Sequence, residues 1–174
     1  MQEEETQGTT EELASLIWYG SFSCWKSVED SIPDTPEQNT RRFFLLYDFL
    51  HVLLYFCRLV ACEVAGQERG TKLADQIDAF VLQNLLLEFA RGIDDDRKVI
   101  EEDFVQGLAR SRQSYALCTH TIDSFDDLFL LFGKHASVDA GLSDQPSFAY
   151  RAQMLAMSVV PTLDLHHRLA ELIR

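Results

Sequence analysis

Residues 43–65, FFLLYDFLHVLLYFCRLVACEVA, form a long apolar run that decides the fold. Helix signals bracket this run. Thr35 and Gln38 are spaced as a capping box around Pro36, which suits a first helical position, and Gly66 suits the turn after a helix. We therefore predict one helix over about residues 36–65. Its middle is apolar nearly all round, so other helices must surround it.

The same run is long enough to cross a bilayer, which is the main alternative to a buried helix. Four ionisable residues argue against a membrane span, namely Asp48, His51, Arg58 and Glu63. A charge at the centre of a spanning helix costs about 2.5–3.5 kcal/mol on insertion scales. No basic segment follows the run to anchor it. We expect a core helix of a soluble protein and no membrane span.

The rest of the chain carries apolar stripes at helical spacing and no sustained period-two alternation. Helix starts are expected at Thr9, Thr71, Asp94, about Ser124 and Pro146. The pattern predicts an all-α, single-domain bundle of five or six helices over residues 9–174, with a flexible acidic segment at residues 1–8. The helix from Asp94 is charged on most faces, so we expect it on the surface.

The composition indicates which kinds of binding partner and which cellular compartment to expect. The 174 residues have a formal net charge of −13 and a pI of about 4.6. Such a surface repels the phosphates of nucleic acids and anionic lipids, and it is compatible with a basic protein partner. The four cysteines include no C-x-x-C pair, and MQEEETQ has no signal-peptide pattern. We expect a reduced, cytoplasmic protein.

The polar residues of the apolar run gather on one helical face. In order along the chain, this face holds Phe44, Asp48, His51, Tyr55, Arg58 and Cys62. Two structural interpretations are open. The face is either the solvent-exposed strip of a mostly buried helix or a buried network, with Asp48 fixing the His51 tautomer and Arg58 paired to an acid on another helix.

A functional interpretation of the same face competes with these two. Asp48 beside His51 would raise the histidine pKa and form an oriented acid–base pair. Tyr55 and Arg58 would bind an anionic group of a small ligand. Arg58 lies one helical turn from Cys62, and it would lower the pKa of that thiol. These five residues are the candidate ligand-binding residues.

A metal site is a weaker possibility. Asp48-x-x-His51 resembles the Glu-x-x-His unit of ferritin-like di-metal bundles, and Asp164-x-x-His167 repeats the spacing. Glu88 and the pair formed by His120 and Asp123 would be further ligands. Aspartate reaches less far than the glutamate of that unit, so the pattern predicts no metal site and no cofactor.

The chain also contains no P-loop, dinucleotide-binding, nucleophile-elbow or zinc-protease motif. No catalytic residue is assigned, and the sequence favours a non-enzymatic protein. It predicts a non-catalytic protein-interaction module, with a protein partner or as a homo-oligomer. The alternative is a small-molecule- or metal-binding bundle that uses Asp48, His51, Tyr55 and Arg58.

Overall fold

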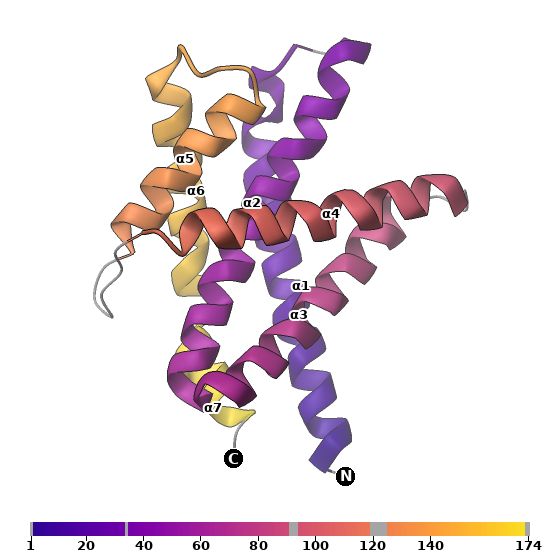
Figure 1. Cartoon of the computed structure of the whole chain (residues 1–174), viewed down its shortest axis with the longest axis vertical. Helices are drawn as coiled ribbons and strands as arrows, with labels where there is room; N and C mark the ends of the chain where they lie inside the picture. Colours follow the sequence, from indigo (N-terminus) through magenta and orange to yellow (C-terminus); the bar gives the residue numbers. More distant parts are fainter. Residues whose placement is uncertain (1, 34, 91–93, 119–124, 173–174) are drawn as a thin grey trace.

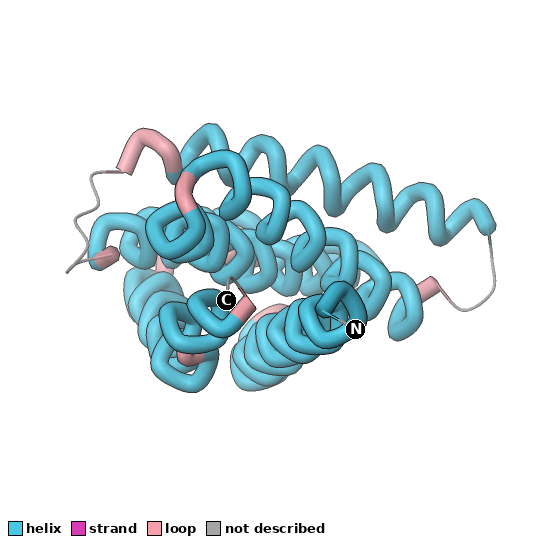
Figure 2. Tube along the Cα trace, turned by 90° about the horizontal axis from the view of Figure 1, so that it is seen from below, coloured by secondary structure: helices cyan, strands magenta, loops and turns pink. Residues whose placement is uncertain are grey.

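The computed structural model describes residues 2–33, 35–90, 94–118 and 125–172 (Figure 1). All regular structure in these residues is helical, and no strand occurs among them (Figure 2). The predicted all-α bundle is confirmed. The helices are α1 (Gln2–Val28), the 3-10 turn η1 (Glu29–Ser31), α2 (Pro36–Ala65), α3 (Gln67–Phe89), α4 (Asp94–Tyr115), α5 (Asp126–Asp139), α6 (Pro146–Leu163) and α7 (Leu165–Glu171).

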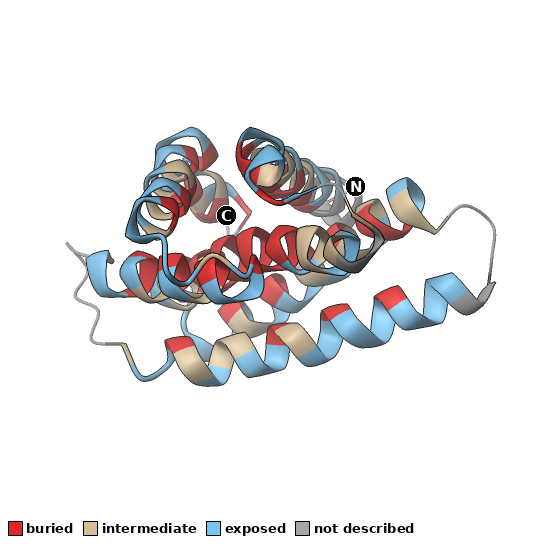
Figure 3. Cartoon of the chain, turned by 90° about the horizontal axis from the view of Figure 1, so that it is seen from above, coloured by how far each residue is buried: buried red, intermediate tan, exposed pale blue. Residues whose placement is uncertain are grey.

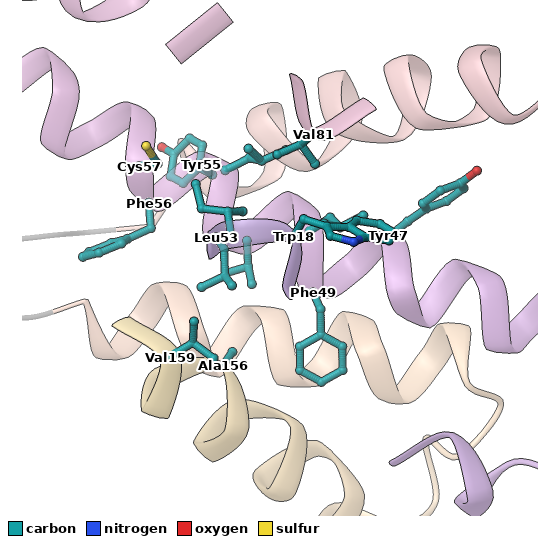
Figure 4. Close-up of a cluster of buried hydrophobic side chains, with 14 of the residues drawn as sticks. Trp18, Tyr47, Phe49, Leu53, Tyr55, Phe56, Cys57, Val81, Ala156 and Val159 are labelled. Carbon is teal, nitrogen blue, oxygen red and sulfur yellow. The ribbon is translucent and has the colours of Figure 1, made fainter. Parts of the chain in front are cut away.

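Helix α2 is the central element, and it contacts each of the other six α-helices. Every residue from 45 to 57 is buried. Figure 4 shows Phe49, Leu53 and Phe56 of α2 among side chains that come from α1, α3 and α6. By length and composition Gln38–Ala65 could span a membrane, but 78% of its most apolar window is buried inside the protein. That burial is typical of the core helix of a soluble protein.

Two helix starts differ from the sequence predictions. Helix α1 begins at Gln2 rather than Thr9, so the segment expected to lie outside the bundle continues the helix. Helix α3 begins at Gln67 rather than Thr71, because Gly66 makes the turn alone with a φ of 77°.

The last predicted helix is divided into two. A proline inside a helix usually kinks or breaks it, but α6 continues past Pro161 to Leu163 before it ends. Asp164 then adopts a left-handed conformation with a φ of 44°, and α7 follows. Leu165 and Leu169 of α7 are buried, and α7 packs against α2.

Helix α4 crosses α2 on one side of the bundle (Figure 1). One edge of α4 is buried, and the opposite edge faces solvent (Figure 3). The buried edge carries Phe104, Leu108 and Tyr115, as expected for a surface helix. At Gly107 the two helices come close, since a Cβ there would lie 2.7 Å from Cε1 of His51 on α2. This close approach places polar residues of both helices together.

Candidate ligand pocket

The polar face of α2 is covered rather than solvated over most of its length. Asp48 is 6% exposed and His51 only 3% exposed. Tyr55 is also buried, with its ring centroid 5.4 Å from that of Tyr115 on α4. The solvent-strip interpretation is therefore wrong for these three residues. Arg58 is partly exposed.

The C-terminal half of this face belongs to an ion cluster with α3 and α4. The Arg58 guanidinium bonds Asp75 and lies 3.6 Å from Asp78 Oδ2. Arg112 of α4 bonds the same Asp78 carboxylate. The expected pairing of Arg58 with an acid on another helix is confirmed. Because Asp78 of α3 contacts an arginine of α2 and an arginine of α4, the cluster links these three helices.

Cys62 lies near the turn between α2 and α3. Its Sγ atom is 3.8 Å from Thr71 Oγ1 and 4.0 Å from the Gln67 carbonyl oxygen. Neither Cys62 nor Tyr55 nor Arg58 lines the pocket described next.

A pocket of about 420 Å³ lies between α2, α4 and α5, and this volume falls within the range of small-molecule sites. Helix α2 contributes Phe44, Asp48 and His51, which form the N-terminal half of the predicted polar face, and the adjacent Tyr47. The contribution from α4 is Asp103, Gly107, Arg110, Ser111 and Ser114. The contribution from α5 is His135, Val138 and Asp139.

Asp48 is a buried acid with a strongly raised pKa. Burial raises the pKa of its carboxyl group well above the usual value, and the charge of Asp139 and a hydrogen bond with the Asp139 side chain raise it further. A hydrogen bond between two carboxyl groups requires one proton, and burial places that proton on Asp48. Among the described residues, no donor lies within hydrogen-bonding distance and angle of the buried Oδ2 atom of Asp48.

His51 is neutral at physiological pH. Burial lowers the pKa of its imidazole to about 3, the nearby Phe104 carbonyl opposes this shift, and the charges of Arg112 and Arg110 add to it. The expectation that Asp48 raises the His51 pKa is therefore wrong. The His51 Nδ1 atom lies 3.3 Å from Ser111 Oγ, whereas its buried Nε2 atom has no hydrogen-bond partner in the described part of the chain.

His135 is a pocket residue that the sequence reasoning missed. Its Nε2 atom lies 3.4 Å from Ser114 Oγ, and its ring stacks on Tyr115 with a centroid distance of 5.7 Å. Burial lowers its pKa, and Asp139 partly opposes this shift. Two sequence features could have identified this part of the pocket. His135 and Asp139 share a face at i, i+4 spacing, and α4 carries small residues at 107, 111 and 114.

The possible metal ligands do not come together in the described part of the chain. No group of three or more His, Cys, Asp or Glu side chains there could hold a metal ion. Asp164 forms the break between α6 and α7, and Glu88 is exposed. The pair formed by His120 and Asp123 lies outside the described residues.

Comparisons with protein-family models, curated proteins and solved structures find no significant match.

The raised pKa of Asp48 predicts how Asp48→Asn changes stability with pH. Above the unfolded pKa of about 3.9 and below the native one, only the native state holds the Asp48 proton, so folding loses up to about 1.4 kcal/mol per pH unit as pH rises. Asparagine removes this loss. The lowered pKa of His51 acts in the opposite direction in both proteins and cancels in their difference.

Urea unfolding of both proteins between pH 4.5 and pH 8 checks this prediction. We expect the stability of Asp48→Asn relative to the wild type to increase with pH. Asp144→Asn, at an exposed loop position outside the pocket, is the control and should give a constant difference. A constant difference for Asp48→Asn as well would show that the Asp48 carboxyl is not buried as described.

Proposed function

We propose that the chain is a small-molecule-binding protein and that the pocket between α2, α4 and α5 is its binding site. The observation that carries the proposal is a pair of buried polar atoms on pocket-lining residues, Asp48 Oδ2 and His51 Nε2, for which the described residues offer no hydrogen-bond partner of good geometry. An unpaired buried polar atom costs about 1–3 kcal/mol. A bound polar molecule would satisfy such atoms.

The electrostatics favour binding over acid–base catalysis. An efficient general base has a pKa near the working pH, whereas the pKa of His51 is lowered to about 3 by burial. Asp48 is held as the protonated partner of Asp139. The site thus offers fixed hydrogen-bonding groups, which suits recognition.

Blocking the pocket tests the proposal. Val138 lines the pocket and is 60% exposed, so it lies at the opening, and a tryptophan there would obstruct entry. Leu130, two turns earlier on α5 and 47% exposed, does not line the pocket and gives the matched control Leu130→Trp.

The assay is a fragment library screened by NMR on the isotope-labelled protein. We expect fragments that shift the amide signals of Gly107 and Ser111 in the wild type and in Leu130→Trp, and no such shifts in Val138→Trp. The proposed binding site would be refuted if no fragment shifts these amide signals in the wild type, or if fragments shift them equally in Val138→Trp.

A protein-interaction module is the second candidate function. The observation that favours it is the exposure of two leucines, since Leu87 is 82% and Leu117 is 87% exposed on a chain of net charge −13. Single exposed apolar residues are ordinary, but ones this exposed are candidates for contact with a protein partner or a second copy. Light scattering over a range of concentrations tests self-association. A monomer at every concentration would exclude the homo-oligomer.

We also propose a cytoplasmic location. All four cysteines, Cys24, Cys57, Cys62 and Cys118, are free thiols. Free thiols are the usual state in a reducing compartment.

A further inference from the structure

Acidic side chains outnumber basic ones in the pocket. It is lined by three aspartates, Asp48, Asp103 and Asp139, against a single arginine, Arg110, so acidic groups remain in excess even while Asp48 is protonated. Its two histidines do not offset this excess, because burial lowers the pKa of both His51 and His135 and leaves their rings neutral at physiological pH. The pocket therefore favours a cationic group over an anionic one. This reverses the sequence expectation of an anionic ligand held by Arg58, which lies outside the pocket.

The positions of the acidic residues indicate which kind of cationic group would bind. Asp48 is buried, lies against Asp139 and has an Oδ2 atom with no described donor within hydrogen-bonding distance and angle. The two carboxyl groups share one proton, so their remaining oxygen lone pairs can only accept hydrogen bonds. A protonated amine supplies only N–H donors and carries the matching charge. On the same wall, Phe44 and Tyr47 offer aromatic surface, which attracts both cations and apolar groups.

We propose that the ligand of this pocket is a small protonated amine with an apolar substituent, its ammonium group bound between Asp48 and Asp139 and its apolar part against Phe44 and Tyr47. This inference rests on the proposed function and names the class of ligand.

Binding of the amine is expected to release a proton. The hydrogen bond between Asp48 and Asp139 holds one proton in the empty pocket. An ammonium group that binds between the two carboxylates replaces this proton, which leaves for the solvent as the amine enters. Binding should therefore release up to one proton and become tighter as pH rises, by up to about tenfold per unit until Asp48 is ionised in the free protein. The charged and titratable groups around Asp48 are Tyr47 and His51 on α2, Asp103, Arg110 and Tyr115 on α4, and His135 and Asp139 on α5.

Three probes of nearly equal shape test the charge preference by calorimetry at pH 7.5. These are phenethylamine, the neutral 2-phenylethanol and the anionic 3-phenylpropionate. A charged hydrogen bond predicts that the amine binds at least about tenfold more tightly than the alcohol, with the propionate weakest. Repeating the amine titration in phosphate and in HEPES, which differ in ionisation enthalpy, measures the released proton.

Two variants test whether the preference for the amine depends on the pair formed by Asp48 and Asp139. Asp139 is exposed, so Asp139→Asn should fold, and we expect it to bind phenethylamine at least about tenfold more weakly with little change for 2-phenylethanol. Asp144→Asn is the matched control and should bind both as the wild type does. Equal binding of amine and alcohol, preference for the propionate, or no binding of any probe to a protein whose pocket still binds library fragments would overturn the amine inference and leave the binding pocket standing. A pocket that binds no fragment at all would refute the proposed function itself.

Discussion

Replacing Phe49 with alanine is expected to lower the free energy of unfolding by about 3–5 kcal/mol. Phe49 lies in the middle of α2, is fully buried and packs its ring 5.1 Å from the ring of Phe132 on α5. Alanine would remove the apolar surface and leave a cavity, because residues from several helices are fixed around it.

Phe44→Ala provides the matched control. It removes the same side chain from the same helix at a position that is 39% exposed. We expect a loss of about 1 kcal/mol or less, since the ring is already largely solvated. Urea denaturation of the three proteins measures both differences. Similar losses for the two variants would contradict the central position of α2.

The second large effect is expected at the ion cluster. The side chain of Asp78 is only 13% exposed and contacts two arginines, Arg58 and Arg112, from two different helices. Asp78→Ala leaves both guanidinium groups without this partner in a partly buried place. Breaking a fully buried pair costs about 3–5 kcal/mol, and the partial exposure of the arginines brings our expected loss of stability to about 2–4 kcal/mol.

Asp75→Ala is the control, because Asp75 bonds the same Arg58 from one turn away and its side chain is 59% exposed. Exposed ion pairs contribute about 1 kcal/mol or less, so this variant should stay close to the wild type. Thermal unfolding of both variants provides the comparison. If the two substitutions prove equally mild, Asp78 does not join α2, α3 and α4 as described.

Much of the fold could be predicted from local signals. Pro36 and Gly66 bound α2 where the sequence places its ends, and the apolar run between them requires the surrounding helices that the structure shows. The start of α1 was missed because residues 2–8 have no apolar stripe, and periodicity detects only helices that bury one. Helix α3 starts early because one glycine makes the whole turn.

The candidate site was only half predictable. Helical spacing placed Asp48 and His51 on one face, and both line the pocket. Arg58 and Cys62 share that face but not the pocket, because α4 crosses α2 and covers only part of its length (Figure 1). Where two helices cross depends on tertiary contacts such as the approach of Gly107 to His51. For the same reason, no spacing within α2 could reveal that Asp139 is the partner of Asp48.

The most direct test is the titration of the His51 ring by NMR, with its signal assigned from the spectrum of His51→Gln. If His51 is buried between α2 and α4, the imidazole should stay neutral from pH 7.5 down to about pH 4.5, in keeping with its pKa of about 3. A midpoint near the ordinary value of about 6.5 would mean that the ring is solvated and would contradict the burial of His51 on which the account of the pocket depends.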